Sequence, residues 1–150
     1  MIFGIGTDIL SINRIARIKN LNHFANKILG TSELKKFHER FGSSKEATAI
    51  NEIEYIQIKR NIVNYLSKRF CAKEAFFKAL GTGIGNENMR FGDVEILNLP
   101  SGKPYIAVTQ KIHDFISKNF VKTGPKDIKF HISISDEKEF SIAFVTIETV

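Results

Sequence analysis

The sequence is poor in the residues that would mark several classes of protein. Its 150 residues contain one cysteine, no tryptophan and three prolines. The single cysteine, Cys71, excludes a disulfide framework and a cysteine-rich metal site, and it favours the reducing cytoplasm. No stretch approaches the ~20 apolar residues of a membrane span, and the first ten residues contain Asp8 and no basic side chain, unlike a signal peptide.

What the chain does contain is typical of one globular domain. Its residues are 43% hydrophobic and 25% charged, and 13 of them are phenylalanine. A chain of this length buries roughly 70% of its unfolded surface. We therefore expect a single domain over residues 1–150 with a core of its own, rather than a disordered or fibrous chain.

The positive charge is concentrated in the first half of the chain. The formal net charge is +6, and residues 1–75 hold 13 basic and 7 acidic residues, whereas residues 76–150 hold 9 of each. This asymmetry favours an anionic partner, namely nucleic acid, an acidic protein or a phosphorylated ligand. A lysine-rich surface without a partner is one alternative. A small basic nucleic-acid-binding protein is the other, although the aromatic residues lie mostly at core spacing.

Apolar spacing and turn residues predict an α+β fold with a mainly antiparallel sheet packed against a long helix. The sheet begins with a buried strand over 2–8, in which Ile2, Phe3 and Ile5 are apolar. The expected helices cover 12–21, a short segment from Thr31, about 60–80, and 110–121. The further strands cover about 93–98, 104–109, 128–135 and 140–148. Residues 42–60 form a variable, partly helical insertion.

Glu74 lies on the apolar face of the predicted long helix. At about 100° per residue it falls within the stripe of Leu66, Phe70 and Phe77. A carboxylate in that position is costly unless it is paired or binds a cation. An ordinary ion pair with Lys78, four residues on, is the structural alternative.

Asp8 is a second carboxylate in an unusual place, because aspartate is disfavoured at the end of an apolar strand. It could cap the next helix. If it instead meets Glu74, the two carboxylates suit Mg²⁺ completed by water and phosphate oxygens. The glycine-rich loop 81–85 follows the same helix and offers backbone N–H groups to phosphate. Three basic residues of the helix add positive charge: Arg69, Lys73 and Lys78.

The strand over 128–135 places polar side chains on one face. His131, Ser133 and Ser135 alternate there with apolar residues. Such a row is either the solvent side of an edge strand or the wall of a ligand groove.

Four blocks of this sequence resemble the bacterial holo-acyl-carrier-protein synthases. In the family's order they are Gly4-Ile5-Gly6-Thr7-Asp8-Ile9, RFCAKEAFFKALGTGI at 69–84, Gly102-Lys103-Pro104 and His131-Ile132-Ser133-Ile134-Ser135. The second block is similar to the signature helix and loop of the family and is the most specific of the four. Together the blocks span almost the whole chain.

The resemblance implies a 4′-phosphopantetheinyl transferase. Such an enzyme moves phosphopantetheine from coenzyme A to a serine hydroxyl of apo-acyl carrier protein, releases 3′,5′-ADP and supports fatty acid biosynthesis. By the family pattern, Asp8 and Glu74 bind Mg²⁺ and are catalytic with Lys78. Either Glu74 or a water on the metal takes the serine proton. The residues implied at the coenzyme A site are Arg69, Lys78, Gly81, Thr82, Gly83, Pro104, His131 and Ser133.

The resemblance also implies the partners. Arg14 and Arg17 of the first helix would receive the acidic carrier protein, which would give the basic half of the chain a function. Members of this short type are typically homotrimers with active sites at subunit interfaces. Neither nucleic acid nor a membrane is an expected partner, and the stretch 42–60 is an insertion relative to compact members.

Overall fold

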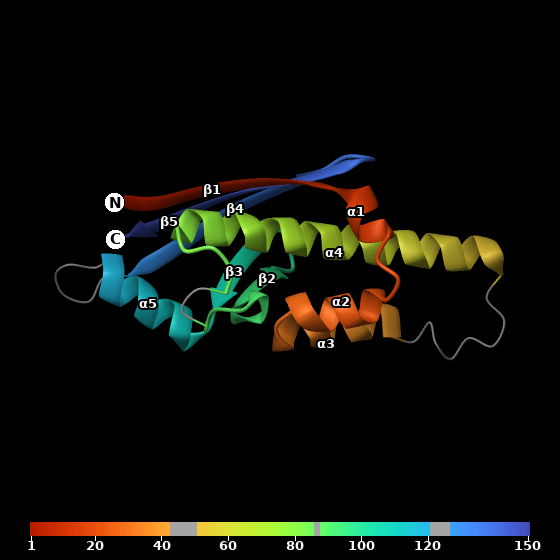
Figure 1. Cartoon of the computed structure of the whole chain (residues 1–150), viewed down its shortest axis with the longest axis horizontal. Helices are drawn as coiled ribbons and strands as arrows, with labels where there is room; N and C mark the ends of the chain where they lie inside the picture. The colour runs from red at the N-terminus through yellow and green to blue at the C-terminus, as the bar shows by residue number, and fades with distance from the viewer. Residues whose placement is uncertain (43–50, 86–87, 121–126) are drawn as a thin grey trace.

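A long helix, α4 (Glu52–Leu80), runs along a three-stranded antiparallel sheet in the computed structural model (Figure 1). The structure describes residues 1–42, 51–85, 88–120 and 127–150. The other elements in chain order are β1 (Ile2–Ser11), α1 (Ile12–Ala16), α2 (Leu21–Ile28), α3 (Thr31–Phe41), the 3-10 turn η3 (Phe91–Asp93), β2 (Val94–Asn98), β3 (Pro104–Val108), α5 (Gln110–Phe120), β4 (Ile128–Asp136) and β5 (Phe140–Thr149). Both sheets, β1-β5-β4 and β2-β3, are antiparallel, so the predicted α+β class is confirmed.

The ends of α4 follow from local sequence. At its start, Asn51 accepts a hydrogen bond from the Glu54 backbone N–H at 2.9 Å, and Glu54 bonds back to the Asn51 N–H. Such reciprocal bonds satisfy donors that the first turn leaves free. At its end Gly81 has φ 76°, a left-handed conformation that suits glycine. The predicted end at Gly81 is therefore confirmed.

Two glycines let β1 approach α4 closely. A Cβ atom on Gly6 would lie 2.0 Å from the Ala75 carbonyl oxygen, and one on Gly4 would lie 2.1 Å from that of Ala79. No larger residue fits between strand and helix at these points. Because side chains alternate along a strand, Ile5 then points away from α4 and is exposed. Ile2, which precedes the register shift between Ile2 and Gly4, is exposed as well. The sequence predicted that both isoleucines are buried, and in the single chain this prediction is wrong.

The same alternation gives the sheet two unlike faces. On the face toward α4, Asp8 of β1 is opposite Ala143 of β5, which is opposite Ile134 of β4. The buried residues of β5 all belong to this face: Ser141, Ala143, Val145, Ile147 and Thr149. The other face exposes apolar side chains: Ile5, Ile9, Phe140, Ile142 and Phe144.

The predicted helix over 12–21 is interrupted. α1 ends at Ala16, and the Asn20 side chain accepts a hydrogen bond from the His23 N–H at 2.9 Å to begin a separate helix, α2. A capping asparagine here outweighs the apolar spacing that would continue the first helix. α2 was not expected from the sequence.

Part of the predicted insertion over 42–60 is helical. Residues 52–60 form the first turns of α4, so the long helix begins eight residues before the predicted position 60. Residues 43–50 lie outside the described part of the chain. No helix in the described residues is both long and apolar enough to cross a bilayer.

The sequence predicted that Lys73 adds positive charge near the carboxylates, and the structure shows that this is wrong. Its ammonium group is fully buried and pairs with Glu33 of α3, which is also fully buried, while donating hydrogen bonds to the Ile28 and Phe91 carbonyls. Burial lowers the pKa of Lys73, and the negative charge of Glu33 raises it but does not fully offset the effect of burial. The pair joins α3 to α4 and is structural.

Candidate active site at the sheet-facing side of the long helix

Asp8 and Lys78 meet where β1 runs alongside α4. The Lys78 Nζ donates a hydrogen bond to the Asp8 carboxylate at 2.8 Å; the Asp8 side chain is 14% exposed and that of Lys78 is 54% exposed. The pKa of Lys78 is raised, and the hydrogen bond to Asp8 is the largest cause. The predicted alternative of Asp8 as a helix cap is wrong, because its carboxylate faces α4 and Ser11 occupies the cap position of α1.

Glu74 lies one turn before Lys78 on the same face of α4 and is half-buried. Burial raises its pKa, the negative charge of Asp8 raises it further, and Lys78 and Arg14 partly oppose both effects. The two carboxylates are therefore close enough to repel each other. Both carboxylates thus lie beside Lys78, which is the condition on which the hypothesis of a cation site depends; the cation site itself stays a prediction.

The donor set fits a hard divalent cation. Mg²⁺ in proteins is usually bound by one or two carboxylates, with the remaining positions taken by water and substrate phosphates. Asp8 and Glu74 supply two carboxylates, and a cation between them would offset their repulsion. No group of three or more acidic, histidine or cysteine side chains gathers in the described residues.

Positive charge lies close to the two carboxylates, and a glycine-rich loop follows α4. Arg14 of α1 lies near enough to Glu74 to lower its pKa, and its guanidinium lies 5.9 Å from the centroid of the Phe70 ring. The loop that starts at Gly81 begins three residues after Lys78, and Gly83 has φ 69°. Arg17, the C-cap residue of α1, is exposed. Phosphate oxygens arriving here would meet Lys78, Arg14 and the start of this loop.

Arg69 points elsewhere. It lies five residues before Glu74, which is about 140° around the helix, and its Nη2 donates to the Asn98 side-chain oxygen at 2.6 Å. Its guanidinium stacks 4.2 Å from the centroid of the Tyr65 ring. Asn98 in turn pairs with Pro104 across the β2-β3 hairpin, so Arg69 contacts the hairpin at the position opposite Pro104.

Arg69 forms part of a polar pocket of about 430 Å³. The pocket combines three cations with amide and phenol groups: Arg40, Asn61, Asn64, Tyr65, Lys68, Arg69 and Asn98. The Arg69 Nε is buried and donates no hydrogen bond within the described residues. A buried cationic donor without an acceptor suits an anion.

His131 and Ser133 lie on the face of the sheet that points away from α4. Both are exposed, and His131 Nε2 lies 2.8 Å from the Glu148 carboxylate. Within one chain the sheet separates them from Asp8 and Glu74. The structure thus places Asp8, Glu74 and Lys78 together, Arg69 beside the β2-β3 hairpin that contains Pro104, and His131 and Ser133 on the far face of the sheet. The Gly81-Thr82-Gly83 loop follows the end of α4.

Sequence reasoning missed several members of the polar pocket. Asn98 precedes the hairpin turn that was predicted, so its position was available, but its contact with Arg69 links residues 29 apart. Asn61, Tyr65 and Arg69 follow one another on α4 at four-residue steps. This spacing places them on one face of the helix and could have indicated the pocket from the sequence. Arg40 comes from α3, and nothing local indicates that it reaches this pocket.

Comparisons with known proteins decide the family. Residues 4–145 match the model of the 4'-phosphopantetheinyl transferase superfamily. The chain belongs to this superfamily.

Several phosphopantetheinyl transferases resemble this chain over nearly their whole length. A holo-[acyl-carrier-protein] synthase of Wolbachia pipientis is 40% identical over 98% of both chains. The crystal structure of the holo-[acyl-carrier-protein] synthase of Neisseria meningitidis is 35% identical, covers 99% of both chains and has a TM-score of 0.72. That of Bacillus anthracis, described as a complex with CoA (3',5'-ADP), is 31% identical, covers 100% of this chain and 99% of its own, and has a TM-score of 0.65.

These findings confirm the predicted family and transferase class. They also agree with the observed fold, in which antiparallel sheets pack on a long helix. The alternative of a nucleic-acid-binding protein has no support among the relatives.

Proposed function

We propose that this phosphopantetheinyl transferase is a holo-acyl-carrier-protein synthase whose chemistry takes place at Asp8, Glu74 and Lys78. It transfers 4′-phosphopantetheine from coenzyme A to a serine of apo-acyl carrier protein, in support of fatty acid biosynthesis. The observation that carries the proposal is the pair of mutually repelling carboxylates beside Lys78, in a chain that matches the family over residues 4–145. The free thiol of Cys71 is in keeping with the cytoplasm as its location.

Asp8 and Glu74 would hold Mg²⁺ through their carboxylate oxygens. When bound, the ion would neutralise charge on the coenzyme A pyrophosphate and so ease departure of 3′,5′-ADP. Lys78, which hydrogen-bonds Asp8 in this structure, is long enough to turn its ammonium group to a phosphate oxygen. Arg14 and the backbone at Gly81-Thr82-Gly83 add to the binding of phosphate.

The reaction needs one proton acceptor. The serine oxygen attacks the phosphorus that bears the pantetheine arm, the bond from that phosphorus to the oxygen of the leaving nucleotide breaks, and 3′,5′-ADP departs. Two acceptors are open for the serine proton: Glu74, which lies beside this point, or a water molecule held there.

The remaining coenzyme A residues would come from a neighbouring subunit. Arg69 lines the polar pocket, Pro104 pairs with Asn98 of that pocket, and His131 and Ser133 lie beyond the sheet, so one chain does not bring them to Asp8. A homotrimer in which the pocket of one subunit faces the carboxylates of another unites the three groups. The unpaired Arg69 Nε would then meet a phosphate of coenzyme A.

The exposed apolar face of the sheet supports the homotrimer. Ile5, Ile9, Ile142 and Phe144 lie together on β1 and β5, and their side chains are 45–65% exposed. Exposed apolar patches of this kind mark protein interfaces. His131 and Ser133 lie beside the patch on β4, so an interface there would also place them at a neighbour's site.

The test is the intact mass of an apo-acyl carrier protein after incubation with the enzyme, coenzyme A and Mg²⁺. We expect the carrier to gain one phosphopantetheine group, and EDTA or Asp8→Ala to abolish the gain. Asp114→Ala is the matched control, because Asp114 is exposed on α5, and it should leave the gain unchanged.

Two results would contradict the proposal in different ways. Absence of any gain with folded enzyme and several carriers would exclude the reaction. A full gain with Asp8→Ala or in EDTA would leave the reaction in place and exclude the proposed metal site.

A further inference from the structure

The first turns of α4 extend beyond the three-stranded sheet (Figure 1). We call residues 52–62 the α4 arm. Three of its large apolar side chains are exposed, namely Ile53 at 80%, Tyr55 at 57% and Ile56 at 57%. A solvated helix needs no such residues, and three of them within one turn indicate a surface that meets another molecule.

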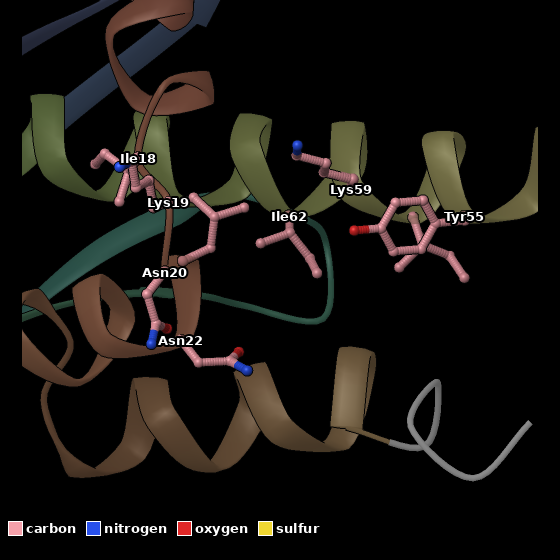
Figure 2. Close-up of a pocket in the computed structure, with 9 residues that line it drawn as sticks. Ile18, Lys19, Asn20, Asn22, Tyr55, Lys59 and Ile62 are labelled. Carbon is pink, nitrogen blue, oxygen red and sulfur yellow. The ribbon is translucent and has the colours of Figure 1, made fainter. Parts of the chain in front are cut away.

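One groove lies between the arm and the connection from α1 to α2. Figure 2 shows Tyr55, Lys59 and Ile62 on the α4 side and Asn20 and Asn22 across from them. The groove has a volume of about 310 Å³, and its remaining lining residues are Ile18, Lys19, Leu21 and Ile58. Among the described residues, its lining combines apolar side chains with two lysines and includes no acidic one.

A second groove lies on the other side of Lys59, between the arm and α1. It is lined by Ile12, Asn13, Ala16, Ile56, Lys59, Arg60, Val63, Asn64 and Lys138. Three of these side chains are cationic and none is acidic. The acidic residues of the arm, Glu52 and Glu54, lie in its first turn, outside both grooves.

The second groove is aligned with the catalytic carboxylate. Ile56 precedes Glu74 by 18 residues, which is about five turns, so both lie on the same face of α4 about 27 Å apart. A domain of about 100 residues has a radius of gyration near 13 Å, or a diameter of roughly 30 Å. A small carrier domain with its serine at Glu74 therefore extends across α1 as far as the arm.

We propose that the α4 arm and its two grooves form a second docking surface for the acidic carrier protein, continuous with Arg14 and Arg17 of α1. Apolar side chains of an acidic helix of the carrier pack against Tyr55 and Ile56. Carboxylates of that helix meet Lys19, Lys59 and Arg60. This inference rests on the proposed function, because it takes the carrier protein as the substrate.

The test compares two arm variants with a distant control. Ile56→Asp removes an apolar contact, and Lys59→Glu reverses a charge shared by both grooves. Lys118→Glu is the control, since Lys118 is exposed on α5 at the opposite end of the molecule (Figure 1). Thermal unfolding of each variant shows that the fold is retained.

We expect both arm variants to raise the KM for apo-carrier protein about tenfold, the effect of losing one good interface contact. The KM for coenzyme A and kcat at saturating carrier stay at wild-type values. Added salt raises the wild-type KM for carrier, and Lys59→Glu weakens this dependence. Lys118→Glu behaves as wild type.

Three other outcomes separate the possible failures. Wild-type KM values for carrier in both arm variants would overturn the inference while leaving the transferase activity intact. A smaller oligomer of Ile56→Asp in light scattering would show that a second copy covers the arm, which also overturns it. If the wild type transfers nothing, titration of a fluorescent apo-carrier decides: weaker binding by both arm variants upholds the docking surface, and unchanged binding overturns it.

Discussion

Glu74 is held in an environment that disfavours its charge. Burial and the neighbouring Asp8 both raise its pKa, and Lys78 and Arg14 offset this only in part. A carboxylate whose pKa is raised on folding makes the folded state less stable at any pH where it is ionised. The residue therefore lowers stability at neutral pH, as expected of a group kept for function.

Glu74→Gln separates these two roles. Without Mg²⁺, the variant should unfold at a higher temperature than wild type at pH 7, because it removes a disfavoured charge. The gain should shrink as the pH falls through the raised pKa of Glu74 and vanish below the ordinary value of 4.5, where wild type is also neutral. Carrier modification should fall by a factor of at least ~10². Calorimetry across pH and a turnover assay measure the two effects.

Glu137→Gln is the control for this change, since Glu137 is exposed in the β4-β5 turn. It should alter neither quantity. A lower unfolding temperature for Glu74→Gln at pH 7 would show that Glu74 stabilises the fold, contrary to its environment here.

At the scale of elements, α4 is attached to its surroundings by contacts that differ in kind. Toward α3 and β2 it presents the buried Lys73, whose partner Glu33 also accepts hydrogen bonds from the Gly30 and Ile96 backbone N–H groups, both at 2.9 Å. Toward β1, backbone atoms of α4 pack directly against Gly4 and Gly6. The first attachment orients the helix, and the second sets its distance from Asp8.

Glu33→Ala should destabilise the protein strongly. It leaves the buried Lys73 ammonium without a counter-charge and two backbone donors without an acceptor, which together cost about 3–5 kcal/mol. Glu39→Ala, at an exposed position of the same helix, should cost under ~0.5 kcal/mol. Urea unfolding measures both.

The double variant Glu33→Leu with Lys73→Met should recover much of the loss, because neither charge is then buried alone. A loss for Glu33→Ala as small as that for Glu39→Ala would contradict the structural role given to the pair.

Gly6→Ala should push β1 away from α4. Its methyl group would lie 2.0 Å from the Ala75 oxygen and 2.4 Å from the Ala79 nitrogen, and forced overpacking costs typically 1–3 kcal/mol. Because Asp8 is two residues on, carrier modification should fall more than stability alone explains. Gly42→Ala is the control, since its nearest neighbour would be 3.7 Å away and its φ of −71° is ordinary for alanine. A Gly6→Ala enzyme with wild-type activity and stability would refute the close approach.

At the scale of the whole molecule, the described part of the chain leaves two surfaces exposed. One is the apolar face of β1 and β5, and the other is the basic and apolar α4 arm. The first suits a second copy of the chain, because Ile9 lies opposite Ile142 in an uncharged patch. The second carries positive charge and suits an acidic partner.

Phe144→Glu should break the proposed homotrimer. Phe144 lies at the centre of the apolar face, opposite Thr7 of β1 and Ser133 of β4, and a buried unpaired carboxylate there would be costly. Light scattering should show a trimer for the wild type and monomers for the variant, with activity lost in the variant. Since the side chain is 47% exposed in one chain, the monomer should stay folded by circular dichroism. A variant that remains trimeric would place the interface elsewhere.

The sequence by itself determined the elements whose interactions are local. Helical spacing placed Glu74 and Lys78 on one face, and Gly81 ended the helix, because neighbours at three and four residues interact within the helix. The turn at 100–103 determined the hairpin and hence Pro104. Where two local signals competed, as between apolar spacing and the Asn20 cap, the outcome could not be predicted from spacing alone.

Only the tertiary structure decided which distant residues meet. Lys73 was expected to add positive charge near the carboxylates, but it is buried and pairs with Glu33, 40 residues earlier. Arg69 belongs to the same sequence block as Glu74, yet it turns to Asn98 on another face. Such contacts depend on how strands and helices pack across the whole chain, where a small rotation changes every partner, and no local pattern records that packing.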